Sequence, residues 1–272
     1  MKVLLLTDFS KHAQNGITYA MAMLKGKKVD YILLNTYIEP YTSADMLISI
    51  RDILAKQSEE QLTIQADKLQ KHISADKQSV KTLAIYGTLP HTVSAVIKEE
   101  KIDMVIMGTH GKEGLVKLLK GSHAESLARK IKCPLLIIPE HYKYQPIKSI
   151  ALALGSNSLT HKQTLTPILK LGEEQNAQLL VVHVQSDEDK TAFEQADVRI
   201  KHILGDTPYH FHYIEDDNIV TGINHFVNEK KAGMLAVVPG RYGTISGLFH
   251  KSITKRIASS SNIPVMVLHE KN

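Results

Sequence analysis

The stretch Asp103–Ser122 reads DMVIMGTHGKEGLVKLLKGS, and its pattern decides the fold class. A short apolar run, Met104–Met107, leads directly into Gly108, as expected for a buried strand that ends in a turn. Gly111 follows after two further residues, and Gly121–Ser122 follow after another nine. Glycines let backbone amides approach a ligand closely, and a helix N-terminus attracts anions. The spacing therefore indicates a strand, a candidate phosphate loop and a helix.

The chain contains two copies of this pattern. The segment KIDMVIMGTHG at Lys101–Gly111 has a counterpart in KKAGMLAVVPGRYG at Lys230–Gly243. The segment KCPLLIIPEH at Lys132–His141 is echoed by NIPVMVLHE at Asn262–Glu270. Two copies of one domain explain a chain of 272 residues.

Short apolar runs alternate with helical patterns within each copy. We expect domains at residues 1–140 and 147–272, with a linker at 141–146. Alternating strands and helices predict an α/β fold of two tandem doubly wound domains, each a Rossmann-like five-stranded parallel sheet with helices on both faces. The predicted strands of the first copy are Val3–Leu6, Tyr31–Leu34, Lys81–Ile85, Met104–Met107 and Leu135–Ile138, and two of its predicted helices are Ile48–Ile73 and His91–Lys98.

Composition narrows the classes of partner. The net charge is +5, but lysines dominate it, the arginines are scattered, and there is no Trp to stack on bases. We therefore expect no nucleic-acid binding. The first apolar run, Val3–Leu6, is far too short to span a bilayer, so we expect no membrane association. Cys133 is the only cysteine, which excludes an intrachain disulfide and favours a cytoplasmic location.

The glycine spacing resembles that of a known family. G-2x-G-9x-G-[S/T] after a strand, inside a five-stranded α/β unit, is similar to the ATP-binding universal stress proteins. The resemblance extends to the TDFS turn at Thr7–Ser10, to Asn35–Thr36 after the second apolar run, to Gly87, and to the segment Asp103–Gly108. It covers the whole chain as a tandem pair.

The resemblance implies a nucleotide site in the first copy. Asp8 would meet the adenine–ribose end, the main chain of Thr36 would face the adenine, and Met107 with Gly108 would line the ribose. His123 stands where the family often has a small apolar residue, so the detail of the phosphate loop stays open. The implied nucleotide-binding residues are Thr7, Asp8, Phe9, Thr36, Met107, Gly108, Thr109, His110, Gly111, Lys112, Gly121, Ser122 and His123.

The same resemblance sets expectations for ligands and assembly. The cofactor would be ATP or another adenine nucleotide, accompanied by magnesium, although no acidic cluster in the sequence identifies the ion. We expect no resident metal site and no catalytic residue. The two halves would pack as an intramolecular pseudo-dimer, and a homodimer of the whole chain would add to it.

The second copy departs from the pattern. Gly240 and Gly243 keep the two-residue gap, so we expect Gly240 to stand at the position of Gly108. Lysine and serine at 251–252 replace the expected Gly–Ser, and Asp8 has no counterpart, because Leu154 or Gly155 occupies that turn. We therefore expect that the second copy does not bind ATP in the manner of the family.

Three functions remain open from the sequence. The first is an ATP-binding stress-response or regulatory module without strong catalytic activity. The second is a slow ATPase or nucleotide hydrolase that uses the same site. The third is a tandem protein that binds a partner or a ligand other than a nucleotide, in which case the glycine loop is a plain turn.

Overall fold

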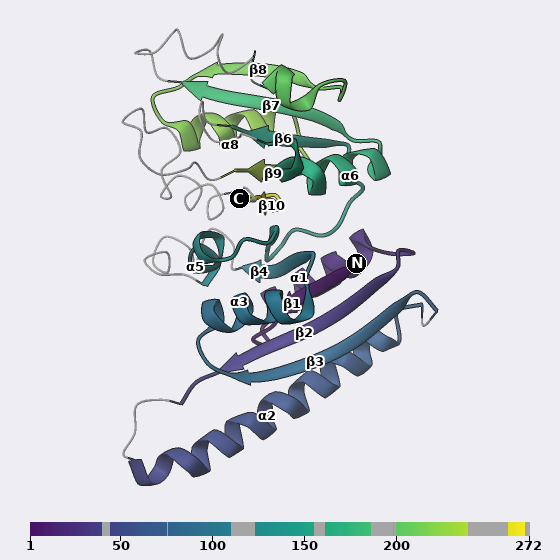
Figure 1. The fold of residues 1–272 in the computed structure, drawn as a ribbon. Helices are drawn as coiled ribbons and strands as arrows, with labels where there is room; N and C mark the ends of the chain where they lie inside the picture. The colour runs from purple at the N-terminus through teal and green to yellow at the C-terminus, as the bar shows by residue number, and fades with distance from the viewer. Residues whose placement is uncertain are drawn as a thin grey trace. The chain divides into compact units, whose positions relative to one another are not determined.

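The computed structural model describes residues 1–39, 44–74, 76–109, 123–154, 161–185, 198, 200–238 and 261–269. The described chain forms two compact units, and the change from one to the other falls between Tyr144 and Gln145 (Figure 1). The elements of the first unit are β1 (Lys2–Leu6), α1 (Lys11–Met23), β2 (Val29–Tyr37), α2 (Ala44–Gln70), β3 (Gln78–Tyr86), α3 (Leu89–Glu100), β4 (Met104–Thr109), α5 (His123–Lys130) and β5 (Leu135–Pro139).

The strands of the first unit form a parallel sheet in the order β3-β2-β1-β4-β5. The central strands β1 and β4 are apolar and almost completely buried, as expected for parallel strands that are covered on both faces. The strand order runs from β1 outward to β3 and then returns to β4. Right-handed crossovers therefore place α1 and α2 on one face of the sheet and α3 and α5 on the other.

Contacts between the helices agree with this arrangement. The Gln65 side-chain amide of α2 donates to Gln14 of α1 at 3.0 Å, which joins the two helices on one face. On the other face, α3 and α5 pack on each other and lie in front of the strands in Figure 1. The sheet is thus covered on both sides by helices, which is the doubly wound arrangement.

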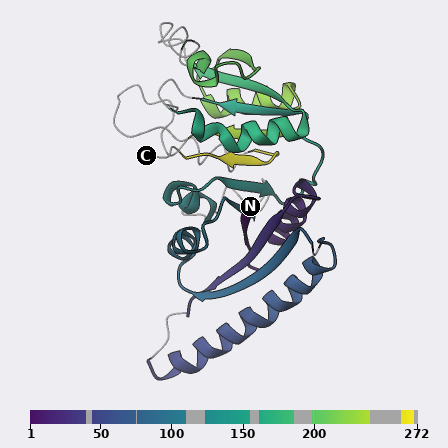
Figure 2. The ribbon, with the colours of Figure 1, turned by 45° about the vertical axis from the view of Figure 1, so that its right-hand side comes forward.

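Helix α2 is the longest element of the described chain and runs along β2 and β3 at the outer edge of the sheet (Figure 1; Figure 2). Ser58, Leu62, Gln65 and Leu69 are buried, and their spacing of four, three and four residues follows one face of a helix. This buried face alternates polar with apolar side chains. The polar pair reaches other elements of the unit through hydrogen bonds.

Helix α1 approaches the end of β4 closely enough to require glycine. A Cβ added at Gly108 would lie 1.8 Å from the carbonyl oxygen of His12, and one added at Gly16 would lie 2.7 Å from the amide nitrogen of Gly108. Backbone therefore packs directly on backbone at this point. Gly108 was predicted from the sequence as a ligand-binding glycine, and the structure gives it a structural reason as well.

The strands of the second unit form a parallel sheet in the order β8-β7-β6-β9-β10. This order corresponds strand by strand to β3-β2-β1-β4-β5 of the first unit. Asn218 caps the start of helix α8, because its side chain accepts hydrogen bonds from the amides of Val220 and Thr221. The elements of this unit are β6 (Ser149–Ala153), η1 (Lys162–Leu165), α6 (Thr166–Gln175), β7 (Gln178–Gln185), β8 (His210–Glu215), α8 (Ile219–Glu229), β9 (Met234–Val237) and β10 (Val265–Val267).

The predicted fold class is confirmed: both halves are parallel α/β units with flanking helices. The helix predicted at Ile48–Ile73 is α2, at Ala44–Gln70, and the one predicted at His91–Lys98 is α3, at Leu89–Glu100. The domain limits 1–140 and 147–272, with the linker between them, stay a prediction.

The close approach of α1 to β4 predicts a strong effect of a single methyl group. Gly108→Ala should destabilise the protein by about 1–3 kcal/mol or more, because the new Cβ would overlap backbone atoms that cannot move away. Gly172→Ala is the control, since the nearest atom to a Cβ there is 3.7 Å away and helix α6 should gain about 0.5–1 kcal/mol. Denaturant unfolding measures both. Equal stability of the two variants would contradict the packing described.

Candidate functional site

The candidate site lies at the carboxyl ends of β1, β2 and β4, where the strand order of the first unit reverses. β2 lies on one side of β1 and β4 lies on the other. Leu6 is opposite Leu34 of β2, and Leu5 is opposite Ile106 of β4. Parallel α/β sheets bind ligands at such a reversal, because the chains that follow the neighbouring strands leave toward opposite faces.

The turn after β1 is held by its own short side chains. The Thr7 hydroxyl accepts a hydrogen bond from the Phe9 amide at 3.0 Å, and the Asp8 carboxylate accepts one from the Ser10 amide at 3.1 Å. The Ser10 hydroxyl then caps α1 by accepting from the Ala13 amide. After β1 ends, these side-chain hydrogen bonds take the place of main-chain bonds to a neighbouring strand, and the chain turns directly into α1.

Phe9 has a backbone φ of 64°, in the left-handed region that usually requires glycine. For a residue with a Cβ this conformation costs on the order of 1 kcal/mol. The ring is half-buried. A strained residue between a central strand and a helix is a frequent feature of functional turns.

Asp8, Ser10 and His12 form a polar cluster at the start of α1. The Ser10 hydroxyl donates to Asp8 and lies 3.0 Å from His12 Nε2, which itself lies 3.3 Å from the second Asp8 oxygen. Partial burial raises the pKa of Asp8, but the bonds from Ser10 and the nearby His12 outweigh it and lower the pKa overall. Asp8 therefore presents a fixed, exposed carboxylate at the strand reversal. No sequence pattern had indicated His12 as a member of this cluster.

The end of β2 brings Thr36 to the same edge of the sheet. Asn35, which precedes it, is buried and donates from Nδ2 to the Thr7 carbonyl at 2.8 Å. Its Oδ1 accepts from the Ser58 hydroxyl of α2 at 2.7 Å. The predicted residues Thr7 and Thr36 are thus joined through a side chain that was not predicted. Asn35 belongs to the polar end of β2 that carries part of the family resemblance, but its place in the sequence gives no sign of these hydrogen bonds.

The end of β4 supplies Met107, Gly108 and Thr109. Met107 is buried, Gly108 packs on α1, and Thr109 is half-buried. These residues pair with the end of β5 through Gly108 opposite Ile138. The structure therefore gathers Thr7, Asp8, Phe9, Thr36, Met107, Gly108 and Thr109 at the ends of three adjacent strands.

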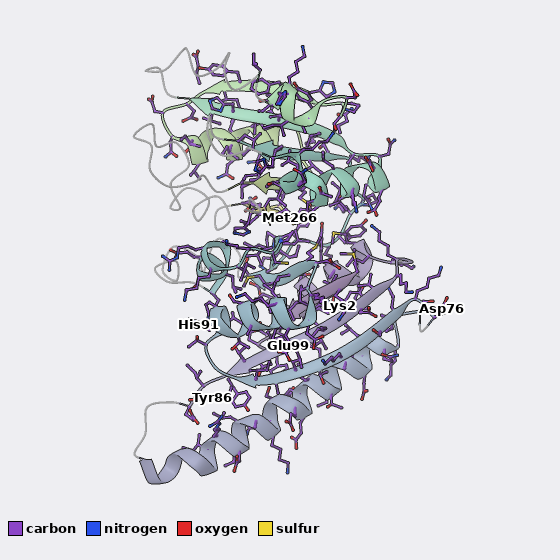
Figure 3. All side chains as sticks on the ribbon, viewed as in Figure 1. Lys2, Asp76, Tyr86, His91, Glu99 and Met266 are labelled. Carbon is purple, nitrogen blue, oxygen red and sulfur yellow. The ribbon has the colours of Figure 1, made fainter. Side chains whose placement is uncertain are left out.

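A second polar cluster lies beside the ends of β2 and β3. Tyr86, which is labelled in Figure 3, packs edge-on against Tyr37 with ring centroids 6.0 Å apart. The Arg51 guanidinium lies over the Tyr86 ring, 4.1 Å from its centroid. Arg51 also lies 4.0 Å from a Glu39 oxygen. A hydrogen bond to Glu39 raises the pKa of Tyr86. This cluster ties α2 to the sheet edge beside the candidate site.

The predicted phosphate-binding residues His110, Gly111, Lys112, Gly121 and Ser122 lie outside the described residues. His123 begins α5 and is exposed. Within the described part of the chain, no group of three or more His, Cys, Asp or Glu side chains is arranged to hold a metal ion. Nor does that part contain a helix that is long and apolar enough to span a membrane.

The second unit presents an apolar version of this edge. The strand registers place Leu154 at the position of Thr7, Val184 at that of Thr36 and Val238 at that of Gly108, and all three are buried. The expectation that Gly240 corresponds to Gly108 is therefore wrong by two residues. The matching glycine gap was misleading, since strand pairing and not glycine spacing fixes the end of β9.

The fold and the polar edge define a doubly wound α/β module, and the family comparison identifies its class. The model of the universal stress protein family matches residues 1–139, half of the chain. The chain therefore belongs to the universal stress protein family, as the sequence motifs had indicated.

Individual relatives support both the family and the tandem arrangement. A universal stress protein of Methanocaldococcus jannaschii is 27% identical over 152 residues, which cover 50% of this chain and 93% of that protein. The crystal structure of a universal stress protein from Archaeoglobus fulgidus is similar along nearly the full length, covering 99% of this chain and 98% of that one. Its TM-score is 0.72 at 18% identity, which establishes the tandem fold.

Some related universal stress proteins bind adenine nucleotides. One has been crystallised in complex with cAMP, and one from Arabidopsis thaliana has AMP bound. They cover 47% and 51% of this chain, with TM-scores of 0.35 and 0.39 and identities of 17% and 14%. At this level of similarity they place no ligand on this chain.

The hydrogen bonds of Asp8 predict a pH-dependent contribution to stability. A carboxylate with a lowered native pKa stabilises the fold above its ordinary pKa of about 3.9, and this contribution is lost as the pH falls through the native value. Asp8→Asn should lower Tm at pH 7 slightly, on the order of 1 °C, because solvent screens this exposed carboxylate. The difference should fade below about pH 4.

Thermal unfolding of both proteins from pH 2.5 to pH 7 measures this dependence. Asp67→Asn, at an exposed position of α2, controls for the loss of one negative charge. A difference between Asp8→Asn and the parent that persists unchanged at pH 2.5 would contradict the electrostatic origin.

Proposed function

We propose that the first unit binds ATP, or another adenine nucleotide, and that the protein is an ATP-binding regulatory module of the stress response. The observation that carries the proposal is the exposed Asp8 carboxylate, oriented by Ser10 at the reversal of strand order. A carboxylate in such a place is suited to accept hydrogen bonds from ribose hydroxyls. The glycine pattern that ends at Ser122 begins at Gly108, which lies at this same edge of the sheet, and it supports the proposal.

The residues present fit this ligand in chemical type. The adenine end would meet the main chain at Thr36, the ribose would meet Asp8, and the phosphates would meet the glycine loop and the start of α5. A triphosphate would bring magnesium with it as a counter-ion, held mainly by phosphate oxygens.

The proposal assigns no catalytic residue. Asp8 and His12 both contact the Ser10 hydroxyl, and that hydroxyl caps α1, so Ser10 is committed to holding the turn and is not a candidate nucleophile. We expect bound ATP to act by shifting the population of conformations and to be hydrolysed weakly at most. The single buried Cys133 is compatible with a cytoplasmic location.

Calorimetric titration with ATP and magnesium tests the proposal. One site per chain is expected, and Gly121→Asp should abolish binding, because a carboxylate in the loop would repel phosphate. Lys251→Asp, at the corresponding place in the second copy, should leave the affinity within about twofold, since that copy lacks the glycine pattern. A protein that shows no saturable binding, that still binds ATP with Gly121→Asp, or that loses binding with Lys251→Asp contradicts the assignment.

A further inference from the structure

The pairing of β1 with β2 ends at Leu34, although β2 itself continues to Tyr37. The ladder ends with Leu6 opposite Leu34, where the Thr7 amide donates to the Leu34 carbonyl at 3.0 Å. The next step of the same parallel pattern would bring the Thr36 amide to the Thr7 carbonyl. That carbonyl instead accepts from the side chain of Asn35 at 2.8 Å. A side-chain amide thus takes the place of a strand bond.

This substitution determines what the main chain of Thr36 faces. Successive residues of a strand direct their N–H and C=O groups to alternate sides. The main chain of Tyr37 faces β3, because its carbonyl accepts a hydrogen bond from the Gly87 amide at 2.9 Å. Thr36 must therefore direct both its N–H and its C=O toward β1, which has already turned away. One donor and one acceptor are left side by side at the strand reversal.

Asn35 is itself held from the far side by α2. Its Oδ1 accepts from the Ser58 hydroxyl at 2.7 Å, and both residues are buried. The bond fixes which end of the amide faces Thr7, since the oxygen is occupied by a hydroxyl donor. A buried amide that is hydrogen-bonded at both ends has one orientation, and so does the strand end that it supports.

The second unit reaches the same arrangement with different chemistry. His183 stands at the register position of Asn35 and is 1% exposed. Its Nδ1 lies 3.0 Å from the Leu154 carbonyl, which corresponds to that of Thr7. A carbonyl only accepts, so Nδ1 carries the proton. Two unrelated side chains thus donate to the same carbonyl, which indicates that a side-chain donor is required where this strand pair separates.

We propose that Asn35 is the positioning residue for base selection: by engaging the Thr7 carbonyl, it keeps the Thr36 N–H and C=O open for adenine. The inference rests on the proposed nucleotide site. Adenine offers the N1 acceptor beside the N6 donor, which complements this pair. Guanine offers an O6 acceptor beside an N1 donor, which places like groups together, so adenine is selected over guanine.

The experiment compares ATP and GTP affinities of the full chain and three variants. The parent should bind ATP at least about tenfold more tightly than GTP. Asn35→Leu removes the donor at similar size, lets β1 and β2 pair one step further, and should reduce this preference about tenfold. Asn35→His, which copies His183, should restore it to within about threefold of the parent. Ser58→Ala keeps the bond to Thr7 and should change the preference only about twofold to threefold.

Hydrogen exchange at the Thr36 amide tests the geometry without any nucleotide. In the parent, this amide should exchange at least about tenfold faster than that of Leu34, which lies within the ladder. In Asn35→Leu it should become protected. Protection of Thr36 in the parent would overturn the inference, as would an Asn35→Leu variant that binds ATP with the parent's preference. A parent that binds neither nucleotide would instead refute the proposed function, while the exchange result still decides the geometry.

Discussion

The first unit depends on the packing of backbone against backbone where α1 crosses the end of β4. Without a Cβ at Gly108 and Gly16, the helix approaches until the His12 carbonyl is almost in contact with the strand. This approach brings the start of α1 to the point where strand order reverses. The Asp8 turn, the capped helix and the end of β4 consequently meet at one edge. A larger residue at either glycine would move the helix and separate these parts.

The second unit shows that the fold itself does not need this contact. Val238 occupies the register position of Gly108, and Leu154 and Val184 replace Thr7 and Thr36. The sheet order is unchanged. What differs is the chemistry of the edge: polar groups and a carboxylate in the first unit give way to buried aliphatic side chains in the second. The two halves therefore show that this sheet folds with either a polar or an apolar edge at the strand reversal.

Much of the fold could be predicted from local patterns. Apolar runs such as Met104–Met107 and Leu135–Ile138 specify buried parallel strands, and the internal repeat specifies two units. The family motif also indicated Asp8 and Gly108. The role of Asn35 could not be predicted, because its partners Ser58 and Thr7 lie 23 and 28 residues away in the sequence. The role of His12 could not be predicted either, because its contact with Ser10 depends on the geometry of the turn. Gly240 was misassigned since glycine spacing says nothing about strand register.

The central claim is that a nucleotide binds at the strand reversal of the first unit and not at that of the second. Backbone amide shifts in a two-dimensional nitrogen–proton spectrum, recorded as ATP and magnesium are added, test it most directly. The account predicts saturable shifts for Asp8, Thr36 and Gly108, with the corresponding amides of Val184 and Val238 unmoved. Shifts at Val184 and Val238, or none at the three residues of the first unit, would contradict it.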